Sequence, residues 1–172
     1  DLVRFNYESR EDMFDGVSYN KGGGILHMLR NYLGDDAFFA GLSDYLKTNE
    51  YGTGEAHQLR LSLEKVSGKD LNWFFNQWYF GKGYPKLEVK STFDPMKKQV
   101  TVNVAQTQEE KFEFPLSIDV LENGKISRKE VWVTAKVKND FVFDVTKNPE
   151  LINANPEGLL LSDIKQDKTP EQ

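Results

Sequence analysis

The sequence contains no cysteine, and this absence excludes disulfides, thiolate zinc sites and cysteine nucleophiles. Histidine is also scarce, because only His27 and His57 occur in the 172 residues. No apolar run approaches the ~20 residues that span a bilayer. Lys and Arg form no basic run, and the formal net charge is −5. We therefore expect no membrane span and no nucleic-acid partner.

The residues that are present suit a folded protein. Hydrophobic residues make up 38% and aromatic residues 13% of the sequence, which is enough to bury a core in one or two small domains. The chain starts at Asp1 without an initiator methionine, and we interpret it as a fragment of a longer protein.

The first half of the sequence has the period of α-helices. From Tyr19 to about Tyr79, apolar residues recur at the spacings of one helix face, and short polar loops interrupt them. This pattern predicts four short helices in a bundle or part of one. The aromatic residues between Trp73 and Phe80 are interpreted as its core. The signals expected to end or cap the helices are Gly34-Asp35-Asp36, Thr53, Ser67-Gly68 and Asp70.

Beyond Gly81, Gly83 and Pro85 the pattern changes to the period of two that is typical of β-strands. Asn123-Gly124 predicts a two-residue hairpin turn, and about seven short strands are expected. The predicted fold class is therefore α+β in two parts. An all-helical subdomain over 1–85 precedes a small antiparallel β-sandwich over 86–165 and a disordered tail over 166–172.

Self-contained catalytic motifs are missing from the sequence. A helical zinc hydrolase needs the pattern H-E-x-x-H, but His27 has no second histidine four residues later. We interpret His27 as a helix histidine with local contacts and His57 as a solvated residue. The run Gly22-Gly23-Gly24 lacks the Lys-Ser/Thr pair that follows a phosphate-binding loop, and no G-x-S-x-G elbow occurs. Composition and periodicity alone therefore predict no active site within the chain.

One long stretch nevertheless resembles a known enzyme family. The segments are SYNKGGGILHMLRNYLGDDAFFAGLSDYL, YGTGE and LEKVSGKDLNWFFNQWYFGKGYP. Their order and spacing are similar to the later part of the catalytic domain of aminopeptidase N-like zinc metallopeptidases of the gluzincin clan. The resemblance is close over 14–85 and weaker over 86–164, where that family has a small β-sandwich. It implies a C-terminal fragment of a zinc-dependent aminopeptidase, which hydrolyses N-terminal residues from peptides.

The resemblance implies one catalytic residue, Tyr19. In the family, the tyrosine of a Y-x-K-G segment donates a hydrogen bond to the oxyanion that forms during peptide hydrolysis, and here the segment reads Tyr19-Asn20-Lys21-Gly22. Such a donor typically contributes ~100- to 1000-fold in rate. The structural alternative is an aromatic side chain at a helix start, packed on the bundle. Lys21 is assigned no catalytic role, and we hypothesise that the glycines let the helix start lie close against neighbouring backbone.

The sequence departs from the family pattern in one large respect. The H-E-x-x-H box, the downstream Glu ligand and the loop that binds the substrate amino group lie upstream in the family, and none is present here. Zinc is therefore expected in the parent protein only, and the isolated chain is expected to hold no catalytic zinc and to be inactive.

The resemblance also suggests partners and a location. The expected partners are peptide substrates and the upstream catalytic-domain segment, and helix faces left without that segment predict self-association through apolar residues. Family habit favours an exported location, periplasmic or at the cell surface. The alternative function is a non-catalytic binding or assembly module of a family member that has lost its metal site.

Overall fold

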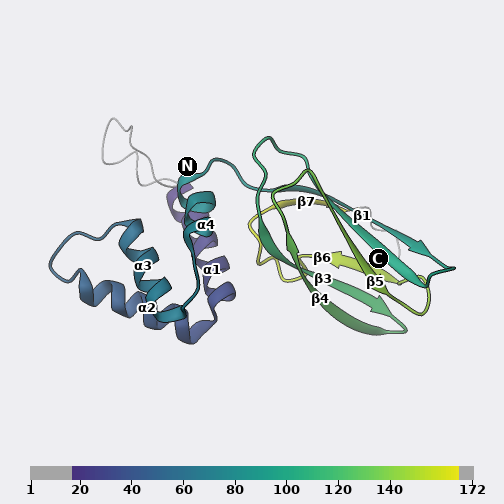
Figure 1. Cartoon of the computed structure of the whole chain (residues 1–172), viewed down its shortest axis with the longest axis horizontal. Coiled ribbons are helices and arrows are strands. Elements are labelled where there is room, and N and C mark those ends of the chain that lie inside the picture. The colour runs from purple at the N-terminus through teal and green to yellow at the C-terminus, as the bar shows by residue number, and fades with distance from the viewer. Residues whose placement is uncertain (1–16, 167–172) are drawn as a thin grey trace. The chain divides into compact units, whose positions relative to one another are not determined.

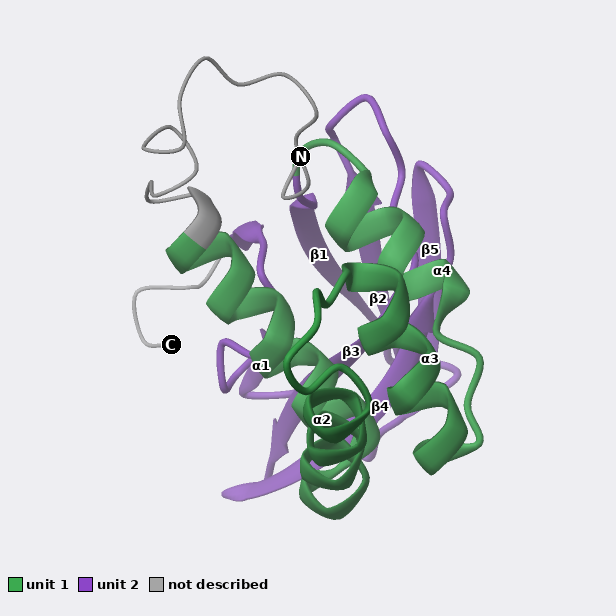
Figure 2. Cartoon of the chain, turned by 90° about the vertical axis from the view of Figure 1, so that its left-hand side faces the viewer, with its two compact units in different colours: residues 1–83 green, residues 84–172 purple. Residues whose placement is uncertain are grey.

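The structure is a computed structural model in which residues 17–166 are described. The chain divides into two compact units, 1–83 and 84–172 (Figure 2). Within the described residues, the helices lie in the first unit and the strands in the second (Figure 1). The fold class is therefore α+β, as predicted. The assignment of 1–85 and 86–165 to a catalytic subdomain and a following module stays a prediction.

The first unit contains the four α-helices that the apolar pattern predicts, together with two π-helical segments. The fourth helix differs from the prediction, because α4 is short and the aromatic stretch continues as the π-helix η3. The bounds are η2 Val17–Lys21, α1 Gly22–Leu33, α2 Asp35–Thr48, α3 Ala56–Ser67, α4 Asn72–Phe75 and η3 Asn76–Phe80.

The end of α1 and the start of α3 show which residues end and cap these helices. Gly34 ends α1 with a φ of 83°, and its N–H donates to the carbonyl of Arg30 at 2.8 Å. Thr53 was expected to cap α3, and this prediction is wrong. The cap is Glu55, whose side chain accepts from the backbone of Gln58 while the Gln58 amide oxygen accepts from the Glu55 N–H at 2.8 Å. This reciprocal pair satisfies two backbone donors, whereas a single hydroxyl satisfies one.

Aromatic side chains form much of the core of the helical unit. Phe74, Phe75 and Trp78 are at most 3% exposed, and Tyr79 is 7% exposed. The rings of Phe75 and Tyr79 stack with their centroids 4.5 Å apart. The interpretation of this stretch as core is therefore confirmed for these four residues, while Phe80 at its end is 44% exposed.

The second unit consists of two sheets that form a sandwich (Figure 1). Their strand orders are β5-β2-β1-β7 and β4-β3-β6. Alternate residues of β2 and β3 are buried between the sheets, as the period of two predicts. The bounds are β1 Lys86–Asp94, β2 Gln99–Gln106, β3 Phe114–Glu122, β4 Lys125–Val133, β5 Lys138–Asp144, β6 Leu151–Ala154 and β7 Asp163–Gln166.

The strand pairing confirms one prediction and corrects another. Asn123 and Gly124, with φ of 53° and 68°, form the predicted two-residue turn between β3 and β4, where Glu122 pairs with Lys125. The sandwich is not wholly antiparallel, however, because β7 pairs parallel with β1. Gln166, which was expected in a disordered tail, is the last residue of β7, and 167–172 lie outside the described residues.

No helix within residues 17–166 has the length and apolar character needed to cross a membrane.

Candidate functional site

Tyr19 lies in the middle of the five-residue π-helix η2. Its side chain is 65% exposed, so the ring is not buried in the aromatic core that α4 and η3 supply. Short π-helical segments often occur at functional sites, because the extra residue turns a side chain away from the regular helix face. The local geometry of Tyr19 therefore suits a side chain that acts at the surface.

Lys21 ends η2 and reaches far along the sequence. Its Nζ donates to the carbonyl oxygen of Gly83 at 3.3 Å, 62 residues away. The side chain is half-buried, and this burial lowers the pKa of the ammonium from its ordinary value. The Y-x-K-G pattern marks Lys21, but no local sequence signal indicates a bond to so distant a carbonyl.

The three glycines at the start of α1 do not all lie against neighbouring backbone. A Cβ added at Gly23 would meet nothing within 4 Å, so the hypothesis of a close approach is wrong for Gly23 as far as the described residues extend. Lys21, the residue before Gly22, has helical φ and ψ, so α1 continues directly from η2 and does not begin at the glycines. Three consecutive glycines lower the helix propensity of this continuous segment.

The two histidines make local contacts on separate helices. His27 is exposed on α1, with its Nε2 3.3 Å from Asn31 Nδ2, and the same amide donates to the His27 carbonyl at 2.8 Å. His57 is exposed on α3, with its Nδ1 3.3 Å from Arg60 Nη2. Within residues 17–166, no three His, Asp or Glu side chains come together as a metal site would require. The described residues therefore do not fit a zinc ion.

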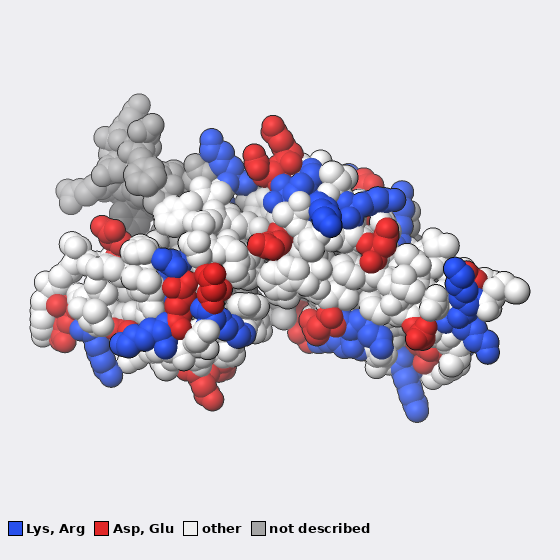
Figure 3. Space-filling view, viewed as in Figure 1, with Lys and Arg blue, Asp and Glu red and all other residues white. Residues whose placement is uncertain are grey.

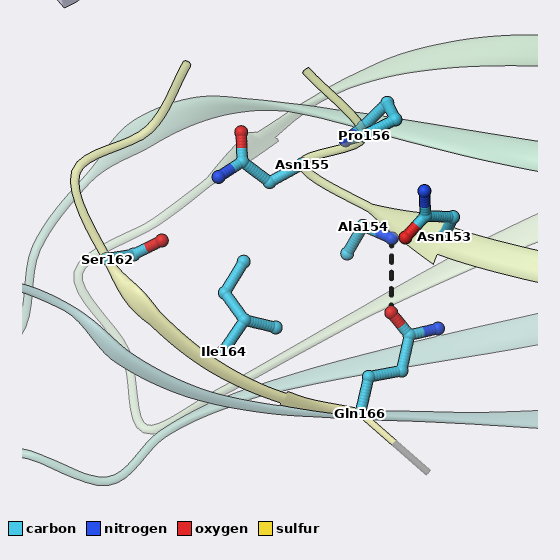
Figure 4. A pocket seen from close by; sticks show the side chains of 7 residues that line it. All are labelled: Asn153, Ala154, Asn155, Pro156, Ser162, Ile164 and Gln166. Carbon is cyan, nitrogen blue, oxygen red and sulfur yellow. Dashed lines mark hydrogen bonds between the residues drawn. The ribbon is translucent and has the colours of Figure 1, made fainter. Parts of the chain in front are cut away.

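A polar hollow of about 380 Å³ lies in the sandwich, beside β6 and β7 (Figure 4). Its amides are engaged in the fold. Gln166 donates to the carbonyl of Ile152 and accepts from the N–H of Ala154. Its side-chain amide therefore makes the two kinds of hydrogen bond with the β6 backbone that an adjacent strand would make. The Asn155 amide likewise bonds both the N–H and the carbonyl of Leu160. These side chains close the sandwich and do not converge on a ligand.

Charged side chains of both signs are interspersed over the face shown in Figure 3. Several form ion pairs within one unit, such as Arg30 with Asp35 and Arg128 with Asp119. A surface of this kind does not present the single-sign patch that a polyanion requires.

Comparison with known proteins places the first half of the chain in a family. Residues 4–78 match the model described as "Peptidase family M1 domain". The chain is 31% identical over 130 residues to tricorn protease-interacting factor F2 of Thermoplasma volcanium, which is 73% of this chain and 17% of that protein. It is 28% identical over 165 residues to aminopeptidase N of Lactococcus lactis subsp. lactis, which is 90% of this chain and 19% of that protein.

The chain belongs to peptidase family M1.

A solved structure shows the same fold as this peptidase family M1 chain. The crystal structure of Legionella pneumophila aminopeptidase A in complex with aspartic acid matches 99% of the chain with a TM-score of 0.86 and 19% identity, and the match covers 20% of that protein. The chain thus spans about a fifth or less of the length of these relatives. The resemblance stated from the sequence is confirmed at the level of the family, and Tyr19 and Lys21 lie inside the matched range.

Proposed function

We propose that the chain is part of a zinc-dependent aminopeptidase that releases N-terminal residues from peptides. The observation that carries this proposal is the Y-x-K-G segment of a peptidase family M1 match, placed on a π-helix with an exposed tyrosine. Relatives named aminopeptidase N and leucyl aminopeptidase, from Lactococcus lactis and Saccharolobus solfataricus, support the same reaction.

In the proposed reaction Tyr19 donates its hydroxyl hydrogen to the oxygen on which negative charge develops as the peptide carbonyl becomes tetrahedral. A donor that is already oriented stabilises this charge more than the neutral carbonyl, and so it lowers the barrier and not only the energy of the bound substrate. The exposure of Tyr19 leaves the ring accessible to a peptide.

The proposal requires groups from outside this sequence. Because the described residues do not fit a zinc ion and the sequence has no H-E-x-x-H pattern, the ligands and the general base are assigned to other parts of the full-length protein. Zinc there would supply a Lewis acid and an activated water. It follows that the 172-residue chain alone is proposed to be inactive.

The expected self-association also stays a prediction. It would occur through exposed apolar residues of α2 such as Phe39 and Leu46.

The experiment measures hydrolysis of an aminoacyl fluorogenic substrate by the full-length protein, with zinc content determined in parallel. Tyr19→Phe should keep the zinc and the KM but lower kcat ~100- to 1000-fold, because it removes only the donated hydrogen bond. Tyr51→Phe is the matched control, since Tyr51 is fully exposed in a loop, and it should leave kcat unchanged.

Two results would contradict the proposal in different ways. If the full-length protein hydrolyses the substrate and Tyr19→Phe is as fast as wild type, Tyr19 has no role as oxyanion donor. If the full-length protein holds no zinc and shows no turnover, the chain belongs to a non-catalytic binding or assembly module of the family.

A further inference from the structure

In the Tyr19-Asn20-Lys21-Gly22 segment the proposed reaction gives a task to Tyr19 only, while the Lys21 side chain bonds a residue 62 positions away. We infer that Lys21 is a positioning residue, whose bond to the carbonyl of Gly83 holds the π-helical segment that carries the Tyr19 hydroxyl. This inference rests on the proposed role of Tyr19. It goes beyond that role, because it assigns the placement of the donor to a contact between two distant parts of the helical unit.

The segment needs such a contact because its local structure is weak. Three consecutive glycines follow Lys21, and glycine is the poorest helix former apart from proline. A catalytic donor that is misplaced by about 1 Å loses much of its effect, so a segment of this kind requires an anchor from elsewhere in the fold.

Gly83 is exposed and lies three residues beyond the end of η3, in which Trp78 is 1% and Tyr79 7% exposed. Its φ of +78° is a conformation that favours glycine, and this conformation sets the direction of the carbonyl. The bond therefore links η2 to the segment that follows the aromatic core.

The Lys21 side chain is half-buried, whereas its bond to Gly83 lies at the surface. The donor is charged, and a charged donor makes a stronger hydrogen bond than a neutral one. The Lys21 ammonium is thus already bonded to the Gly83 carbonyl before a substrate binds. The expected effect of removing it is on the reaction rate, with little effect on substrate binding.

The first test measures amide hydrogen exchange over 17–24 in the full-length protein. Lys21→Met keeps the apolar stem and removes the donor, and it should speed exchange of this segment roughly five- to tenfold. Lys21→Arg, which still presents N–H donors, should restore most of the protection. Lys82→Met is the matched control, because Lys82 is an exposed lysine next to Gly83, and it should leave the segment unchanged. Unaltered exchange in Lys21→Met would overturn the inference.

The second test is a double-mutant comparison of kcat. If Lys21 acts through Tyr19, Lys21→Met should lower kcat about tenfold at unchanged KM and should cost nothing further in the Tyr19→Phe background. An equal loss in both backgrounds would show that Lys21 acts independently of Tyr19 and would overturn the inference. If Tyr19→Phe alone leaves kcat unchanged, the proposed role of Tyr19 as oxyanion donor fails, whereas the exchange measurement still decides whether Lys21 holds the segment.

Discussion

Both units of the chain have apolar cores, but they differ in the polar contacts that accompany them. The sandwich joins distant backbone segments through buried polar side chains, and Gln106 is the clearest case. This residue is 1% exposed, and its amide contacts the carbonyls of Phe112, Thr134 and Lys136 and the N–H of Phe112. The core of the helical unit is rich in aromatic residues, and this unit presents Tyr19 exposed on the π-helix η2, shortly before three glycines.

This difference indicates which unit can hold a side chain that reacts with a substrate. Segments that bind or react come from the less stable parts of a protein, because their side chains must stay accessible. In the sandwich, the polar side chains of the inner positions and of the hollow are engaged in closing the fold. In the helical unit, the candidate donor is accessible, and Lys21, two residues further along the same π-helix, bonds the carbonyl of Gly83.

The largest effect on stability is expected from Gln106→Leu. This change leaves the buried N–H and carbonyl of Phe112 without their side-chain partner, and each unsatisfied buried group costs about 1–3 kcal/mol. The sandwich should lose about 2–4 kcal/mol of unfolding free energy. Native-state hydrogen exchange, resolved by unit, measures the loss while the helical unit serves as internal reference.

Gln99→Leu is the matched control in the same strand. Its amide makes one exposed bond, to Asp144 at 3.0 Å, so the change should stay within about 0.5 kcal/mol. Equal effects at Gln106 and Gln99 would contradict the view that buried polar anchors hold the sandwich.

A smaller effect is expected from Asp119, whose carboxylate is held by Arg128. Arg128 Nε and Nη2 donate to the two carboxylate oxygens at 2.8 and 3.0 Å, and Asp119 is only 8% exposed. The hydrogen bond from Arg128 lowers the pKa of Asp119. Because the folded pKa lies below the unfolded one, this stabilisation is present above about pH 4 and is lost as the pH falls through the folded pKa.

Asp119→Asn should therefore cost the sandwich about 1–2 kcal/mol near pH 7 and flatten the loss of stability in acid. Asp35→Asn in the helical unit is the control, because Arg30 binds Asp35 in the same two-point way but both side chains are exposed. We expect a much smaller change there, since water screens exposed pairs. Urea unfolding between pH 2 and 7 compares the two variants, and similar losses would remove this distinction between the units.

Local signals account for what could be predicted from the sequence. Asn123-Gly124 specified its turn because both residues accept positive φ, and the aromatic stretch before Phe80 was recognisable as core by its spacing. Thr53 failed as a cap because Glu55 and Gln58 form a reciprocal pair that satisfies more backbone groups.

Long-range pairing accounts for most of what was missed. The parallel pairing of β7 with β1 and the bond from Lys21 to Gly83 join residues far apart in the sequence, and no local pattern encodes either. For the candidate site, Tyr19 was identified by resemblance to the Y-x-K-G segment and not by periodicity. Its role stays a prediction.

The smallest effects, of opposite sign, are expected from two glycines of the helical unit. At Gly41 in α2, an added Cβ would lie 2.6 Å from Leu63 Cδ2 and 3.1 Å from Leu63 Cα in α3. Because the second atom is backbone, the helices must separate, and Gly41→Ala should cost about 1–2 kcal/mol despite the better helix propensity of alanine. Gly23→Ala meets open space and should stabilise α1 by about 0.5–1 kcal/mol.

Thermal unfolding followed by helical circular dichroism measures both changes. A loss of stability in Gly23→Ala would mean that a neighbour outside residues 17–166 approaches this backbone, and the original idea of glycines chosen for close packing would regain support. A gain without loss of kcat in the full-length protein would show that Gly23 is dispensable for placing Tyr19. The bond from Lys21 to Gly83 would then remain as the proposed anchor of the segment.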